Sequence, residues 1–261
     1  MAFRQWEPSH LAKFNSSASS EFLEFYENIL DTTIREHEEA ERSRSFSPSS
    51  FRCSRLSWFK LRGTKPDKVE NPDRGLKFAA DIGTACHRII QNNLKEYLND
   101  DWVDVADYLA SIEFPYDYEL THSEDSLECL IAISDPPIRF ACDGIIRWKD
   151  KYYLLEIKTS EFSSWSDLTD PKNEHIDQIK CYAALLNIHN VLFLYQDRQH
   201  GDFKCYEVYV SDDDMDQVKN RMKYILDMVD KNLAPEGLPK GDKWCSPNYC
   251  QYHSKCKEYG R

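Results

Sequence analysis

The sequence predicts an α/β fold in which a mixed central β-sheet is flanked by helices. The first reason is the pattern of apolar residues, which changes along the chain between the periods of helices and strands. The second is composition, because 261 residues with 41% hydrophobic and 30% charged residues are typical of a globular protein with a substantial core. No apolar run approaches the ~18 residues of a membrane span. Residues 1–8 lack the apolar stretch of a secretory signal, so we expect a cytoplasmic protein.

The first part of the chain is predicted to be helical. Apolar residues from Phe22 to Ile34 recur at the spacing of one helix face. Ser47-Pro48 then interrupts the pattern and can begin a new helix. We therefore expect an N-terminal helical extension over residues 1–46 and a larger domain over residues 47–261. In that domain a short helix carries Cys53, Leu56 and Phe59, and a longer helix covers residues 81–98.

From residue 127 the apolar pattern changes from helical to extended. Three runs rich in β-branched and aromatic residues are separated by turn residues, which predicts three consecutive antiparallel strands. These strands cover residues 127–133, 138–148 and 152–159. A helix over 174–187, strands over 191–195 and 203–210, and a last helix after Ser211 complete the order α, βββ, α, ββ, α.

One predicted hairpin brings three charged residues together. If Lys149-Asp150 is the centre of the turn, Asp143 and Glu156 are equally far from it and face each other across the strands. Lys158 lies two residues beyond Glu156 and therefore points to the same face. Such a group suits Mg²⁺ or Mn²⁺, which can activate water for hydrolysis of a phosphodiester. The alternative is a surface ion-pair cluster, although the flanking runs are apolar enough to be buried.

Asp143 followed by Glu156-Ile157-Lys158 resembles the D and E-x-K motifs of the PD-(D/E)XK nuclease superfamily. The segment from Gly83 to Gln91 is similar to the motif whose histidine, here His87, binds metal in the RecB-like branch. The segment from Gln178 to Tyr182 resembles the Q-x-x-x-Y motif of that branch. The resemblance runs from about residue 47 to the C-terminus and implies a restriction-endonuclease-like core.

The resemblance also implies roles for individual residues. The metal ligands would be His87, Asp143, Glu156 and the backbone carbonyl of Ile157. The catalytic set would comprise Asp143, Glu156 and Lys158, with Gln178 and Tyr182 supporting catalysis or contacting DNA. The residue pattern by itself also fits a core histidine at position 87, and an ordinary packed helix over 178–182.

The cysteines suggest a second metal site. In a reducing compartment, clustered cysteines such as Cys245, Cys250 and Cys256 are typical of metal ligands, and a fourth ligand is then needed. RecB-like nucleases with an iron–sulfur cluster, including those of CRISPR adaptation, take one cysteine from before the nuclease core. Cys53 stands at that place. The resemblance therefore implies a [4Fe–4S] cluster bound by Cys53, Cys245, Cys250 and Cys256. This cluster would join the N-terminal segment to the C-terminal segment 244–256.

The spacing of these cysteines leaves a second assignment open. The related families usually have C-x2-C-x5-C, whereas this chain has C-x4-C-x5-C. The alternative is Zn²⁺ bound by Cys245, Cys250, His253 and Cys256. The remaining cysteines, at positions 86, 129, 142, 181 and 205, lie in apolar patterns and are expected in the core.

The charge pattern bears on the substrate. The net charge is −12, but residues 42–77 carry ten Lys or Arg against three acidic residues, and they could contact a phosphate backbone. Residues 96–128 contain eleven Asp or Glu and no Lys or Arg. Trp58 and Phe59, if exposed, could stack on unpaired bases, although core packing is the more common use of both.

Together these observations predict a metal-dependent deoxyribonuclease, an exonuclease or one directed to single strands or ends. It would resemble stand-alone nucleases of phages or of CRISPR adaptation, in the host cytoplasm if phage-encoded. Its partner proteins would then come from recombination, replication or CRISPR adaptation. Two alternatives remain open: a catalytically silent protein that binds DNA ends or a partner, and a nuclease that cleaves RNA.

Overall fold

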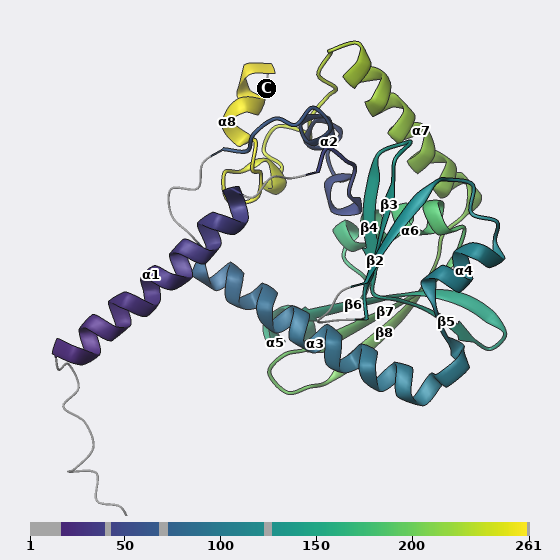
Figure 1. The fold of residues 1–261 in the computed structure, drawn as a ribbon, viewed down its shortest axis with the longest axis horizontal. Coiled ribbons are helices and arrows are strands. Elements are labelled where there is room, and N and C mark those ends of the chain that lie inside the picture. Colours follow the sequence, from purple (N-terminus) through teal and green to yellow (C-terminus); the bar gives the residue numbers. More distant parts are fainter. Residues whose placement is uncertain (1–16, 40–42, 68–72, 123–126, 260–261) are drawn as a thin grey trace, which may run out of the picture. The chain divides into compact units, whose positions relative to one another are not determined.

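The computed structural model describes residues 17–39, 43–67, 73–122 and 127–259, and it divides into two units (Figure 1). The smaller unit contains helix α1 (Ser17–Glu39) and the first residues of helix α3 (Arg74–Leu98). Within this unit, Arg74 of α3 forms ion pairs with two residues of α1, Glu27 at 3.0 Å and Asp31 at 2.6 Å. The larger unit holds the other described residues. The boundary between residues 46 and 47 stays a prediction.

The larger unit is built on a five-stranded mixed sheet, and this confirms the predicted fold class. The strand order is β1-β5-β6-β7-β8. The strands are β1 (Trp102–Val103), β5 (Gly144–Trp148), β6 (Lys151–Ser160), β7 (Asn190–Asp197) and β8 (Phe203–Tyr209). Only β6 and β7 are parallel, and the chain between them forms helices α5 (Phe162–Ser166) and α6 (Asn173–Leu186). The other neighbours are antiparallel.

A second, three-stranded antiparallel sheet contains β2 (Tyr118–His122), β3 (Cys129–Ile133) and β4 (Ile138–Cys142). The predicted strand over 138–148 is therefore two strands, which belong to different sheets and are separated at Asp143. The prediction of one continuous strand was wrong here because the chain bends at Asp143, which is followed by Gly144, and Asp-Gly is a turn signal that the apolar pattern on both sides outweighed. This break places Asp143 where the two sheets diverge.

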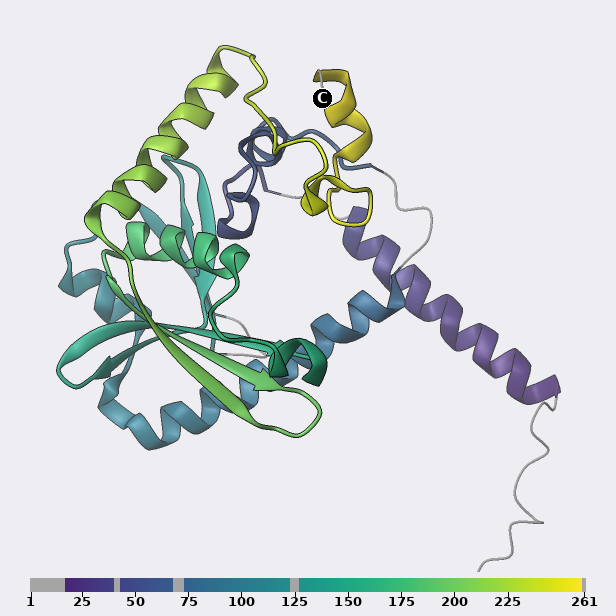
Figure 2. The same cartoon turned by 180° about the vertical axis from the view of Figure 1, so that it is seen from behind.

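Helices cover both faces of the five-stranded sheet (Figures 1 and 2). On one face, α3 packs Ile90 and Leu94 against Leu155 and Ile157. On the other face, α6 and α7 (Asp212–Asp230) pack into the main core, which includes Leu154 of β6. The alternation of side chains along a strand separates these two sets of contacts. The remaining helices are α2 (Ser54–Leu61), α4 (Val105–Ser111) and α8 (His253–Cys256), with short 3₁₀ turns at Pro48–Ser50, Asn99–Asp101, Lys243–Cys245 and Lys257–Tyr259.

Local signals in the sequence explain how several elements end. Lys149 and Asp150 have φ values of 50° and 61°, as the two central residues of a type I′ hairpin turn require. Trp148 pairs with Lys151 across this turn, which confirms the predicted centre of the hairpin. Helix α7 begins with a capping box between Ser211 and Asp214, as its sequence predicts.

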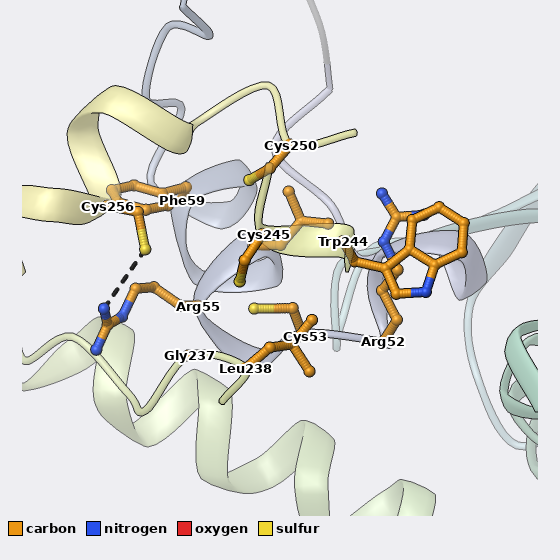
Figure 3. Close-up of a pocket in the computed structure, with 11 residues that line it drawn as sticks. Arg52, Cys53, Arg55, Phe59, Gly237, Leu238, Trp244, Cys245, Cys250 and Cys256 are labelled. Carbon is orange, nitrogen blue, oxygen red and sulfur yellow. Dashed lines mark hydrogen bonds between the residues drawn. The ribbon is translucent and has the colours of Figure 1, made fainter. Parts of the chain in front are cut away.

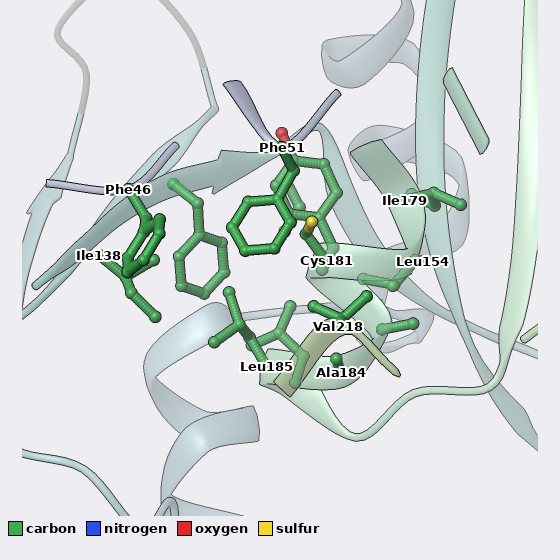
Figure 4. Packing of buried hydrophobic residues seen from close by; sticks show 14 of the residues in the cluster. Phe46, Phe51, Ile138, Leu154, Ile179, Cys181, Ala184, Leu185 and Val218 are labelled. Carbon is green, nitrogen blue, oxygen red and sulfur yellow. The ribbon is translucent and has the colours of Figure 1, made fainter. Parts of the chain in front are cut away.

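The main core joins the start of the larger unit to its end. Phe46 and Phe51 pack in one cluster with Cys181 and Leu185 of α6 (Figure 4). Trp58 and Phe59 are only 1% and 2% exposed, and both rings contact Tyr259 near the C-terminus. The suggestion that these two aromatic rings stack on unpaired bases is therefore wrong.

The five cysteines expected in the core differ in burial. Cys129, Cys142 and Cys181 are buried, and Cys86 is half-buried. Cys205 is exposed, so its placement in the core was wrong. It lies on β8, which pairs only with β7 and leaves alternate side chains open to solvent. Among the described residues, no helix is long and apolar enough to cross a bilayer.

The close approach of Gly144 and Trp102 gives the first prediction. A Cβ atom at Gly144 would lie 2.7 Å from Cη2 of the Trp102 indole. We expect Gly144→Ala to lower the free energy of unfolding by about 1–3 kcal/mol through overpacking, as measured by urea denaturation. Trp102→Phe removes the atoms in conflict, so the alanine should cost much less in that background. An equal cost in both backgrounds would contradict the explanation.

Candidate functional site

The hairpin holds two buried carboxylates against each other. The ladder of β5 and β6 ends at the pair Gly144–Leu155, so Asp143 and Glu156 are the next residues beyond it, in the register that the sequence predicts. Asp143 is 8% exposed and Glu156 is 1% exposed. Asp143 Oδ2 accepts a hydrogen bond from the backbone N–H of Ile157 at 2.6 Å, which fixes the orientation of this carboxylate. Two like charges are thereby confined in a site with little water to screen them.

A lysine and two polar side chains extend from this pair. Lys158 Nζ lies 2.5 Å from Glu156 Oε1 and donates to Gln178 Oε1 at 3.2 Å. Gln178 Nε2 in turn donates to the Tyr182 hydroxyl at 2.8 Å. Gln178 and Tyr182 are one turn apart on α6, which returns from the end of β6 to the start of β7. The structure therefore brings together all four of these predicted residues in one chain of contacts.

His87 of α3 reaches one of these two carboxylates, that of Asp143, and also the carboxylate of Glu128. Its Nδ1 atom is 3.3 Å from Asp143 Oδ1 and 3.8 Å from Glu128 Oε1. One ligand atom from each of His87, Glu128 and Asp143 lies within 4.8 Å of the others, so these three residues could hold a metal ion; the predicted ligand Glu156 is not part of this group. Ile157 is fully buried beside it, and its role as a carbonyl ligand stays a prediction.

Burial and the crowding of charges shift the pKa values of these groups. Burial and the nearby Asp143 carboxylate raise the pKa of Glu156 to about 7. Burial lowers the pKa of His87, but hydrogen bonds to Asp143 and Glu128 outweigh it and raise the value to about 9. For Lys158, burial also opposes the charged form, and the Glu156 carboxylate more than compensates, so its pKa is raised. The site strongly favours positive charge.

Two buried oxygen atoms at the site lack hydrogen-bond partners among the described residues. One is Glu156 Oε2. The other is Oε1 of Gln91, whose Nε2 donates to the Asp143 carbonyl at 2.7 Å. Buried oxygen acceptors in native proteins are rarely left unpaired. Their presence beside His87 indicates that the site is shaped to receive a cation or water.

Sequence reasoning missed three residues of this site. Glu128 was counted only as part of an acidic segment, and it directly precedes β3, which belongs to the other sheet. Gln91 carried a usable signal, because it lies four residues after His87 and therefore on the same helix face. His175 likewise precedes Gln178 by three residues on α6.

His175 is a half-buried neutral base close to Lys158. Its Nδ1 atom is 2.7 Å from the Tyr195 hydroxyl, and the two rings are stacked at 5.7 Å. Burial and the positive charge of Lys158 lower the pKa of His175 to about 3. At neutral pH this histidine therefore adds no charge to the lysine side of the site.

A second site lies between α2 and the C-terminal segment. A pocket here is lined by the four cysteines that the resemblance implies as ligands, Cys53, Cys245, Cys250 and Cys256 (Figure 3). Burial, and to a lesser degree the other three cysteines, raises the pKa of Cys250. His253 is not among the residues that line the pocket. The structure thus brings the four cysteines to one pocket.

No protein-family model matches the chain, and no curated protein matches it significantly. Among solved structures, it is similar to the protein SSO0001, at 17% identity and a TM-score of 0.47, over 89% of this chain and 96% of that one. It is also similar to an alkaline exonuclease, LHK-Exo, from Laribacter hongkongensis, at 15% identity and a TM-score of 0.44, over 76% and 93%. LHK-Exo in complex with dAMP gives 16% identity and a TM-score of 0.42, over 76% and 93%.

His175 provides a test of the electrostatics. Its pKa is lower in the folded state than the ordinary value of 6.5, so only the unfolded chain takes up a proton as the pH falls from about 6.5 towards 3. This group therefore stabilises the fold above that range and progressively less within it. As the pH falls from about 7 to about 5, we expect protonation of His175 in the unfolded chain to lower the free energy of unfolding by up to about 2 kcal/mol. His175→Asn keeps an acceptor for Tyr195 without titrating, and should show a smaller loss in urea denaturation. Identical losses in both proteins would contradict the assignment.

Proposed function

We propose that this chain is a Mg²⁺- or Mn²⁺-dependent deoxyribonuclease of the RecB-like PD-(D/E)XK type. The observation that carries the proposal is the convergence of Asp143, Glu156 and Lys158 in one buried place, beside His87. Burying two carboxylates face to face is unfavourable for folding alone. Such an arrangement is typical of sites that bind a cation and act on an anionic substrate.

The residues at the site fit a hard divalent cation. Glu156 presents a buried oxygen without a partner among the described residues, and His87, Glu128 and Asp143 present ligand atoms close together. We assign the metal to His87, Asp143, Glu156 and the Ile157 carbonyl, with Glu128 as an additional carboxylate. Oxygen donors suit Mg²⁺, and the imidazole nitrogen makes Mn²⁺ at least as suitable.

The protein groups around the cation have separate tasks. When bound, the ion would activate a water molecule and neutralise charge on the scissile phosphodiester. The Lys158 ammonium stabilises the negative charge that develops on the phosphate during attack. Gln178 accepts a hydrogen bond from that ammonium and is itself held by Tyr182, which fixes the position of the lysine. Because His175 is neutral at pH 7, it adds no second positive charge beside the Lys158 ammonium.

DNA is the proposed substrate, and single strands or ends are the proposed targets. Residues 42–77 supply positive charge for contacts to phosphates, although Arg55 in this segment is buried and is not available for them. Because Trp58 and Phe59 are in the core, the preference for single strands or ends rests on the family resemblance. Cytoplasmic location and partners from recombination, replication or CRISPR adaptation belong to the same proposal.

We also propose that Cys53, Cys245, Cys250 and Cys256 hold a [4Fe–4S] cluster. They line one pocket, and the donor set is made of thiolates only. The alternative, a single Zn²⁺ ion, would take His253 as its fourth ligand, and His253 is not among the residues that line this pocket.

The catalytic assignment predicts the effect of removing one charge. Lys158→Met should lower the rate of DNA cleavage in Mg²⁺ or Mn²⁺ by about 10²- to 10³-fold, because an electrostatic contact to the transition state is lost. Lys151→Met is the matched control, since Lys151 is exposed at the other end of the same strand. Single-stranded DNA, duplex DNA and RNA of the same sequence would be compared as substrates. Wild-type rates in the Lys158 variant, or undiminished cleavage in EDTA, would contradict the proposal.

The cluster assignment predicts which cysteine is needed. Cys53→Ser should abolish bound iron and the visible absorption of anaerobically purified protein. It should also lower stability, because a shared metal closes a very long loop between Cys53 and Cys245. Cys205→Ser, at an exposed cysteine on β8, is the control and should keep all of the iron. If His253→Ala loses the metal while Cys53→Ser keeps it, the zinc alternative is correct.

A further inference from the structure

Arg55 is a buried cation in the wall of the cysteine site. It is 7% exposed and lies at the start of α2, two residues after Cys53. Its Nε atom donates to the Pro235 carbonyl at 2.8 Å, and its Nη1 atom donates to Sγ of Cys256 at 3.4 Å (Figure 3). The guanidinium is thus held between the C-terminal segment and one of the four sulfur atoms.

No carboxylate of the described residues lies within ion-pair distance of this cation. Among the described residues, the side chain bonds to one carbonyl oxygen and one sulfur, and no Asp or Glu forms an ion pair with it. A buried charge without a counter-ion strongly destabilises a fold. The negative charge must therefore come from the cysteine site. A cluster bound by four thiolates supplies it, because the thiolates outweigh the positive charge of the oxidised iron–sulfur core.

We propose that Arg55 is the counter-ion of the cysteine site and that its hydrogen bond to Cys256 raises the reduction potential of the cluster. This inference rests on the proposed iron–sulfur cluster. Reduction adds one electron, and so one further negative charge, to the cluster. A fixed guanidinium and an N–H···S hydrogen bond both stabilise the more negative state, and both are known means of tuning such potentials.

Arg52 provides a matched comparison within the same pocket. It also lines the site, but its guanidinium lies over the Trp244 ring at 4.5 Å and donates to the Tyr249 carbonyl. No contact between Arg52 and a cysteine sulfur occurs among the described residues. The two arginines therefore differ in the feature that matters here, the hydrogen bond to sulfur.

The experiment compares Arg55→Gln, Arg55→Lys and Arg52→Gln with the wild type. Each protein is purified anaerobically, its iron content is measured, and its midpoint potential is determined by titration with dithionite and electron paramagnetic resonance. In Arg55→Gln we expect the equilibrium constant for reduction to fall at least tenfold, which is about 59 mV for a one-electron couple. Arg55→Lys keeps the charge and should recover most of this shift. Arg52→Gln should stay near the wild-type potential.

The possible results distinguish a failure of the cluster assignment from a failure of the role proposed for Arg55. Wild-type protein without iron would overturn the cluster assignment, and this inference with it. Iron in the wild type together with an unchanged potential in Arg55→Gln would overturn the role of Arg55 alone. Loss of iron in Arg55→Gln but not in Arg55→Lys supports the counter-ion role. Loss in both, with unchanged far-ultraviolet circular dichroism, contradicts it, because lysine retains the charge.

Discussion

The structure is organised around a repulsion, the one between the buried carboxylates of Asp143 and Glu156. The hairpin register forces them to face each other, and burial raises the pKa of Glu156 to about 7. Left alone, the pair would favour taking up a proton. The surrounding elements each supply something that offsets this: β6 contributes Lys158 and the amide of Ile157, and α3 contributes His87. A cation at the unpaired oxygen of Glu156 would complete the compensation.

Helix α6 connects the two sites through the core. One face carries Gln178 and Tyr182 to the lysine, and Tyr182 also packs against Phe140 of β4 with ring centroids 5.8 Å apart. Other residues of the helix pack against Phe51, which lies two residues before Cys53 (Figure 4). The segment that contains Cys53 therefore packs on the helix whose Gln178 accepts a hydrogen bond from Lys158. Because protein interiors are close-packed, a shift of the Pro48–Ser50 turn, which contacts both α2 and α6, would reach that helix.

The part of the site that could be predicted from sequence is the part set by local geometry. A two-residue turn at Lys149-Asp150 determines the register, so the pairing of Asp143 with Glu156 followed without any knowledge of the fold. The period of a strand then placed Lys158 on the same side. The helical period likewise placed Gln178 and Tyr182 together. In each case a short stretch of chain contained all the information needed.

Features that depend on distant contacts could not be predicted in this way. Glu128 reaches His87 only because the chain leaves one sheet and enters another at Asp143. Trp58 and Phe59 are buried by residues near the other end of the chain, and no local pattern distinguishes that from exposure. Charge counting failed for the same reason at Arg55, which adds to a basic segment in the sequence but lies buried in the structure.

Both sites obey one electrostatic rule. A buried charge is tolerated where the opposite charge is held at hydrogen-bond distance, because the low local dielectric strengthens attraction as much as it penalises isolation. Lys158 meets this condition with the carboxylate of Glu156. Arg55 meets it only if the sulfur of Cys256 carries negative charge, as a metal-bound thiolate does. Acidic side chains are abundant in this chain, whose net charge is −12, yet among the described residues none of them pairs with Arg55. A negatively charged group bound by the cysteines would explain why this arginine is buried.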